Sequence, residues 1–239
     1  MRSPVGHLIR HPDRLEGTRG IAYDFVLAGN GLFVESEGPL MAARILAEPF
    51  DVQGLAPLEP KLVLRHGKIH GSLWELALNL LISSSGLERY VAIVRHDGDG
   101  VYRIKLPDQE QSPAGIREYD RAPNTVVEFH SHPGDAPPHF SGTDDGDEVG
   151  FQVYGVVSNL ARGKPFVRLR VGIYGHWQEI PWTDVFMGAL VDVEDCWDMP
   201  LSVESYLGRL PSGVSFQHGV DGEVIMEHGP EGPPREERT

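Results

Sequence analysis

Glycine and proline occur along the whole chain, with 28 glycines and 19 prolines among its 239 residues. Inside a helix, glycine costs about 1 kcal/mol and proline about 3 kcal/mol relative to alanine, so this density excludes a helical bundle. Short strands joined by many turns tolerate it, because turns use both residue types. At about 100–200 residues per domain, the length allows one large domain or one domain with extensions.

The charge balance and the cysteine count limit the kinds of binding partner and the cellular compartment that the sequence favours. The chain carries 35 acidic and 21 basic residues, a net charge of -14 with neutral histidines, which disfavours a nucleic acid as the main ligand. Cys196 is the single cysteine, which excludes an internal disulfide and suits a reducing compartment. Neither a secretion signal in residues 1–15 nor an apolar run of about 20 residues is present. We therefore expect a cytoplasmic protein without a membrane partner.

Hydrophobic periodicity predicts a β-rich N-terminal third followed by one helix. Apolar and polar residues surround Gly29-Asn30-Gly31, which predicts a hairpin within residues 21–36. A capping box of Ser72 and Glu75 is expected to start the helix, and Gly86 to stop it. The expected apolar face of this helix comprises Leu73, Leu76, Ala77, Leu80 and Leu81.

The rest of the chain is predicted to be strands, loops and a tail. Residues 107–114 are expected to form a polar loop. The pattern divides the chain into a β-rich extension over 1–67, a core over 68–186 and a C-terminal extension over 187–239, with a disordered tail from about 228. Further strands are predicted over 90–94, 101–106, 125–129, 151–158, 166–174 and 176–182.

The segment after residues 125–129 carries the clearest chemical pattern. His130 and His132 leave the same face of an extended strand, so both imidazoles can reach one metal ion. Asp144, twelve residues after His132, can fold back as an oxygen ligand. Two histidines and one carboxylate leave a fourth position open, where zinc lowers the pKa of a water towards ~7. The pattern therefore indicates a catalytic rather than a structural metal site.

His130-x-His132 followed by Ser141-x-x-Asp144 resembles the signature of the JAMM metalloproteases, also called JAB or MPN proteins. These are zinc isopeptidases that cut ubiquitin and ubiquitin-like conjugates. The resemblance runs from about Lys68 to Trp182. It implies an α/β fold in which helices flank a mixed, curved β-sheet, here with a β-rich N-terminal extension. It also implies Zn²⁺ as the cofactor, with His130, His132 and Asp144 as its ligands.

The loop between the histidines and the serine departs from the family pattern. The family has seven residues between the second histidine and the serine, whereas residues 133–140 make eight. Asp145 is therefore an alternative third ligand, and Asp144 is preferred because it keeps the Ser-x-x-Asp spacing. His139 is either an adventitious ligand or an exposed loop residue, and the second interpretation is favoured. The acidic run over 144–148 also fits a helix start, because carboxylates favour the positive end of the helix dipole.

The resemblance also implies catalytic roles. Glu88 matches the family's water-activating glutamate by its place between the helix and the next strand. Its rivals are Glu75, which the capping box explains, and Glu128, which shares the strand face of His130 and could support a ligand from behind. By the same resemblance, Ser141 would donate a hydrogen bond to the oxyanion. Cys196 has no base beside it in the sequence and is interpreted as a packed thiol.

A narrower resemblance extends over Ser141–Glu148, Gly150–Val157 and Arg170–Gly175. These runs look like the prokaryotic JAB proteins called protein A of the PRTRC system, encoded on mobile or plasmid-like elements beside a ThiF-related, E1-like protein. The resemblance implies hydrolysis of an amide or isopeptide bond at the C-terminus of a ubiquitin-like protein, with the E1-like protein as a further partner. The alternatives are a non-catalytic JAB scaffold, and a zinc amidase or peptidase for a small or sulfur-carrier substrate.

Overall fold

The computed structural model describes residues 3–83, 86–96, 100–112, 115–118, 122–161, 163–199, 214–218 and 224–228. The chain forms two compact units, Met1–Asp198 and Met199–Thr239. The second unit contributes the antiparallel pair β18 (Val214–His218) and β19 (Val224–His228). Beyond His228, the predicted tail lies outside the described residues. The boundaries expected after residues 67 and 186 stay predictions.

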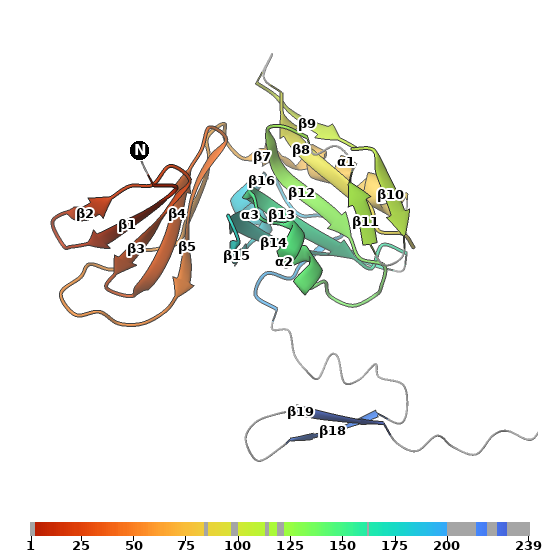
Figure 1. Ribbon diagram of the computed structural model, residues 1–239. Helices are drawn as coiled ribbons and strands as arrows, with labels where there is room; N and C mark the ends of the chain where they lie inside the picture. Colours follow the sequence, from red (N-terminus) through yellow and green to blue (C-terminus); the bar gives the residue numbers. More distant parts are fainter. Residues whose placement is uncertain are drawn as a thin grey trace, which may run out of the picture. The chain divides into compact units, whose positions relative to one another are not determined.

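The N-terminal part of the first unit is a six-stranded sheet in the order β2-β1-β3-β4-β5-β6 (Figure 1). The strands are β1 Val5–Arg10, β2 Leu15–Thr18, β3 Tyr23–Ala28, β4 Gly31–Glu37, β5 Met41–Glu48 and β6 Lys61–Leu64. The predicted hairpin is confirmed as β3–β4. Its two-residue loop is Gly29-Asn30, because Ala28 pairs with Gly31.

The central sheet has the order β15-β14-β13-β12-β8-β9, with β17 beside β14. β12 runs parallel to β13 and antiparallel to β8, so the sheet is mixed. Its strands confirm the predicted ones to within about two residues at each end, and β12 continues to include His130 and Ser131. They are β8 Tyr90–Arg95, β9 Tyr102–Lys105, β12 Thr125–Ser131, β13 Phe151–Ser158, β14 Phe166–Ile173, β15 His176–Ile180 and β17 Glu194–Asp195.

The prediction of a polar loop over residues 107–114 is wrong. Residues 109–112 form β10 (Gln109–Ser112), which pairs antiparallel with β11 (Gly115–Glu118). The segment lacks the apolar alternation of a half-buried strand, so its sequence gives no strand signal. Backbone groups can nevertheless pair across a hairpin, since the ladder uses main-chain donors and acceptors.

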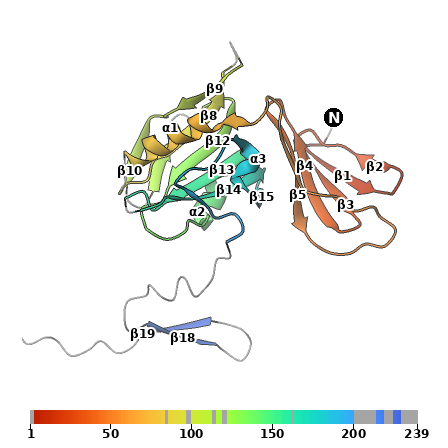
Figure 2. The same cartoon turned by 180° about the vertical axis from the view of Figure 1, so that it is seen from behind.

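The predicted helix is present as α1 (Gly71–Ile82), and Figure 2 shows it lying across the central sheet. The expected capping box is wrong: His70 is the N-cap, and its Nδ1 accepts the Ser72 N–H at 3.2 Å. The helix begins at Gly71, which places Ser72 beyond the capping position. It ends at Ile82, ahead of the stop expected at Gly86.

The buried face of α1 also differs from the predicted one. Trp74, Ala77 and Leu81 are buried, whereas Leu76 is 48% exposed. The ring centroids of Trp74 and Phe129 lie 5.1 Å apart, so the large indole rather than Leu76 determines which side of the helix meets the sheet.

The remaining elements are short. α2 spans Gly142–Asp147, α3 spans Trp182–Val185, and β7 (Ile69–His70) pairs with β16 (Phe186–Met187). The molecule is thus a mixed α/β structure richer in sheet than the helix-flanked arrangement we expected. In the parts of the chain that are described, no helix combines the length and apolarity needed to cross a membrane.

The two faces of the central sheet have different chemistry. Val127 and Phe129 point into an apolar core that also contains Met41 and Ile45 of β5. Because side chains alternate along a strand, Glu128 and His130 point to the opposite face. Buried polar side chains on that face include those of Glu128, His130, Arg168 and Arg170. The candidate site is built on this polar face.

Candidate metal centre

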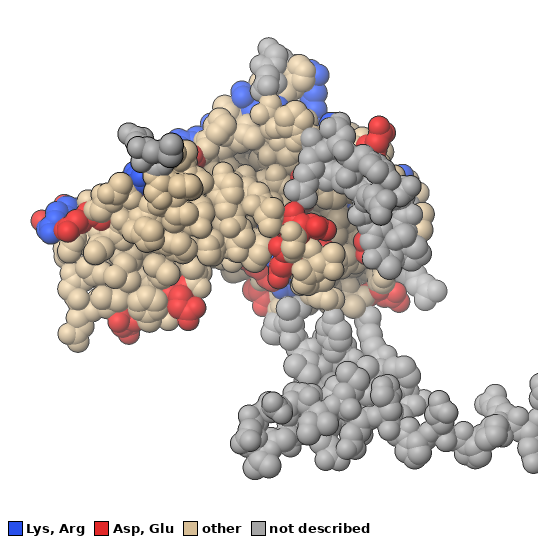
Figure 3. All heavy atoms as spheres, in the orientation of Figure 1, with Lys and Arg blue, Asp and Glu red and all other residues tan. Residues whose placement is uncertain are grey.

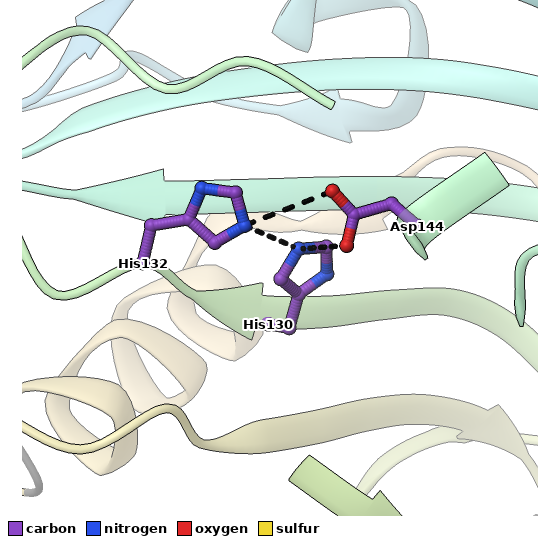
Figure 4. Close-up of side chains that lie close together, drawn as sticks. All are labelled: His130, His132 and Asp144. Atoms are coloured by element: carbon purple, nitrogen blue, oxygen red, sulfur yellow. Dashed lines mark hydrogen bonds and ion pairs between the residues drawn. The ribbon is translucent and has the colours of Figure 1, made fainter. Parts of the chain in front are cut away.

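Three predicted residues meet at the end of β12. The His130 and His132 Nε2 atoms lie 3.0 Å apart, and Asp144 Oδ1 lies 3.2 Å from His130 Nε2 (Figure 4). Asp144 Oδ2 lies 3.8 Å from His132 Nε2. His130, His132 and Asp144 thus offer ligand atoms within 4.8 Å of one another.

The spacing of these atoms fits a small tetrahedral metal ion. With metal–nitrogen and metal–oxygen distances of about 2.0–2.1 Å, two ligand atoms of a tetrahedral zinc site lie about 3.3 Å apart. The observed 3.0, 3.2 and 3.8 Å surround that value. The three side chains could therefore hold a metal ion with small adjustments. Geometry alone does not select zinc among the ions that accept nitrogen and oxygen ligands.

Asp144 is placed by the start of α2. Ser141 is the N-cap: its hydroxyl accepts the Asp144 N–H at 3.2 Å, while the Ser141 N–H donates to Asp144 Oδ2. This reciprocal capping box holds the Asp144 carboxylate towards the histidines. Figure 3 shows acidic side chains gathered around α2 on this face of the molecule. Asp144 therefore combines a helix-capping contact with the position of a candidate metal ligand.

Asp145, the alternative third ligand, has a different partner. Its Oδ1 lies 2.6 Å from Arg170 Nη1, and it is outside the group of three ligand residues. Asp144, rather than Asp145, thus faces the two histidines.

Sequence reasoning missed the groups behind His130. The other ring nitrogen of His130, Nδ1, lies 3.6 Å from Glu148 Oε1. Glu148 Oε2 accepts a hydrogen bond from Arg170 Nε at 2.8 Å, and the indole of Trp177 donates to the Glu148 carbonyl at 3.0 Å. The Arg170 guanidinium also stacks 3.9 Å from the centroid of Phe140. A carboxylate behind a histidine ligand fixes the orientation of the ring and raises its basicity.

The sequence contains a pattern that could have predicted the position of Glu148 and Arg170 behind His130. Glu148 lies four residues after Asp144, one helical turn away, and the alternation of β14 places Arg168 and Arg170 together on one face. Sequence reasoning treated Glu148 only as part of an acidic helix start. The pairing of Glu148 with Arg170, 22 residues further on, needs the tertiary structure.

The three candidate ligand residues shift one another's pKa values. Burial lowers the pKa of His130, but the hydrogen bond and charge of Asp144, with Glu148 and Glu88, outweigh it and raise the pKa overall. Burial raises the pKa of Asp144, yet His130 and Ser141 hold it well below its usual range. Burial and the charge of His130 lower the pKa of His132 to about 4. His132 is thus neutral at pH 7, the form of histidine that binds metals.

Glu88 lies near the group without belonging to it. It is half-buried and lies two residues before the start of β8. Burial raises its pKa, His130 opposes this effect, and Asp144 adds to it. The charges of both residues therefore act on the Glu88 carboxyl.

The other candidate site residues, Glu75, Glu128 and His139, lie outside the group of three candidate ligands. Glu75 is exposed on α1. Glu128 is 4% exposed on the face of His130, and its Oε2 has no hydrogen-bond partner within the described part of the chain. His139 is partly buried, with its ring centroid 6.0 Å from that of His132, so it is less exposed than we expected.

A cavity of about 230 Å³ adjoins His132. One wall is Gly86 and Leu87, directly before Glu88, and another is the segment over 133–135 that follows His132. Leu160 and Ala161 add apolar side chains to the lining. The cavity thus lies between the segments that carry the candidate base and a candidate ligand.

Comparison with known proteins adds no further identification. No protein-family model matches the chain, and no curated protein matches it either.

Proposed function

We propose that this protein is a zinc-dependent isopeptidase or peptidase that hydrolyses an amide or isopeptide bond at the C-terminus of a ubiquitin-like protein. The observation that carries the proposal is the convergence of His130, His132 and Asp144, with Glu88 in electrostatic range of the group. Two imidazoles, one carboxylate and a nearby carboxylate that is not a ligand are the parts a hydrolytic zinc site requires.

The proposed roles follow from position and proton affinity. Zinc held by His130, His132 and Asp144 would act as a Lewis acid and lower the pKa of a water. Glu88 accepts the proton of the attacking water and later delivers it to the leaving nitrogen, a task favoured by its raised pKa. Ser141 lies one helical turn before Asp144, where its hydroxyl hydrogen can stabilise an oxyanion.

The fold supports the same proposal. Its mixed sheet, with α1 on the apolar face and the histidines at the end of β12, fits a JAB/MPN-like core with a β-rich N-terminal extension. The cavity beside His132 leaves room for a substrate residue next to the scissile bond. The ubiquitin-like substrate, the E1-like partner, the cytoplasmic location and the bacterial PRTRC-type setting come from the resemblance of the motif.

Metal analysis and cleavage of defined substrates test the proposal together. The probes are ubiquitin-fold proteins, ubiquitin among them, each joined at its C-terminus through an isopeptide bond to a fluorescent lysine peptide. Zinc-loaded protein is expected to release the peptide, and chelation is expected to stop the release. Glu88→Gln should retain zinc and lose roughly 10²–10⁴-fold in rate, because it removes a general base.

One control variant and two contrary results complete the test of the proposed function. Glu75→Gln changes an exposed glutamate of α1 and should cut at the wild-type rate. Wild-type protein that binds no zinc contradicts the metal site. Zinc-loaded protein that cuts none of the probes contradicts the isopeptidase and favours a scaffold or an enzyme for another substrate class.

A further inference from the structure

The described residues 86–89, which carry Glu88, belong to no helix or strand. α1 ends at Ile82 and β8 begins at Tyr90, so no helix or strand ladder fixes Glu88. A base in such a segment needs other contacts to hold it, since a misplacement of about 1 Å can cost about 10²-fold in rate. The contacts around Glu88 therefore decide how well it is placed.

Ser131 binds the backbone on both sides of Glu88. Its hydroxyl accepts the Arg89 N–H at 2.9 Å, and its own N–H donates to the Arg89 carbonyl at 2.9 Å. The same hydroxyl points its hydrogen towards the Leu87 carbonyl at 3.4 Å, a longer contact. A serine hydroxyl can accept and donate at once, so these contacts coexist.

The position of Ser131 links the base to the ligands. It lies between His130 and His132 at the end of β12 and is 1% exposed. Alternation along the strand turns its side chain away from the face of His130, so it reaches the Glu88 segment rather than the candidate metal. Arg89 adds a second anchor, with Nη1 2.8 Å from the Leu80 carbonyl and 2.7 Å from Ser83 Oγ.

We infer that Ser131 is a positioning residue that holds Glu88 at a fixed place relative to the metal ligands. The inference rests on the proposed function. Ser131 lies outside the group of candidate metal ligands and acts by fixing the peptide groups that flank Glu88. Because one strand carries both histidines and this serine, the base and the ligands are held by the same element.

A pair of variants of equal size isolates the hydroxyl. Ser131→Thr keeps it and Ser131→Val replaces it with a methyl group, so any crowding affects both variants alike. With the ubiquitin isopeptide probe, we expect kcat of Ser131→Val to fall at least about 10-fold below that of Ser131→Thr, with KM within about 3-fold and zinc content near one, because only the placement of the base changes.

A second measurement does not depend on catalysis. The Arg89 amide should exchange its hydrogen slowly in the wild type and in Ser131→Thr, and at least about 10-fold faster in Ser131→Val, because its acceptor is lost. Ser36 provides a matched control: it is 5% exposed in β4, and its hydroxyl donates to the Ala22 carbonyl at 2.6 Å. Ser36→Thr and Ser36→Val should share the wild-type kcat.

Each contrary outcome has a separate meaning. If the wild type cuts and the two Ser131 variants cut equally well, the positioning role is overturned while the proposed function stands. Loss of zinc from Ser131→Val alone would also overturn it, since the hydroxyl would then serve the ligands. If the zinc-loaded wild type cuts no probe, the proposed function fails and the positioning role falls with it.

Discussion

Arg170 and Glu148 form a buried ion pair directly behind a candidate metal ligand. Arg170 Nε lies 2.8 Å from Glu148 Oε2, and the other carboxylate oxygen of Glu148 faces Nδ1 of His130. Both side chains of the pair are almost fully buried. The positive charge thus holds a carboxylate in place, and the carboxylate orients an imidazole.

Removal of the Glu148 charge should weaken metal binding. Loss of a carboxylate behind a ligand typically costs 10–100-fold in metal affinity, so we expect Glu148→Gln to bind zinc roughly 10–100-fold more weakly. The measurement is a competitive zinc titration at pH 8. Burial raises the pKa of Glu148 to about 7, so the wild-type carboxylate is mostly charged at that pH.

A second ion pair, in which only the arginine is buried, provides the control for this variant. Arg168, 2% exposed, lies 2.6 Å from Glu179 on the same sheet face, outside the ligand group. Glu179→Gln should leave zinc affinity unchanged. Equal affinities for Glu148→Gln and Glu179→Gln would show that Glu148 does not support the metal.

The two neighbouring aspartates should respond differently to substitution. Asp144 faces both histidines, whereas Asp145 bonds Arg170, so Asp144→Ala should lose most bound zinc and Asp145→Ala should retain about one zinc per chain. Elemental analysis of the purified variants gives the answer. The reverse ranking would assign the ligand role to Asp145.

Close packing behind the site predicts a stability effect at Gly155. A Cβ at this position of β13 would lie 2.5 Å from two ring carbons of Phe129 and 2.8 Å from a Leu169 methyl carbon. The buried ring must shift, so we expect Gly155→Ala to lower the free energy of unfolding by about 1–3 kcal/mol. Urea unfolding measures this directly. An unchanged midpoint would mean that the Phe129 ring moves without cost.

The thiol of Cys196 should be unreactive in the folded protein. Burial raises its pKa from 9.0 to about 11, and the thiolate is the form that reacts with alkylating reagents. A shift from 9.0 to about 11 lowers the thiolate fraction at pH 8 by about 100-fold. Iodoacetamide should therefore label the native protein at least about 100-fold more slowly than the urea-unfolded protein. Equal rates would contradict a packed thiol.

Local patterns predicted the parts of the structure that neighbouring residues determine. The period of two placed His130 and His132 on one strand face, and the Gly29-Asn30-Gly31 turn marked a hairpin. The helix cap at His70 was missed because the exact start of a helix depends on how the chain enters it. The Glu148–Arg170 pair was missed because its partners belong to different elements.

The candidate ligand residues also differ in the stability of the elements that carry them. His130 lies on β12, paired on both sides, whereas Asp144 lies on the six-residue α2 at the end of a long loop. Local opening is easier for a short helix than for an interior strand. A bound ion would therefore link the loop over 133–141 to an interior strand of the sheet. Zinc occupancy should then control how often that loop opens to a protease, and resistance to proteolysis becomes a measure of metal loading.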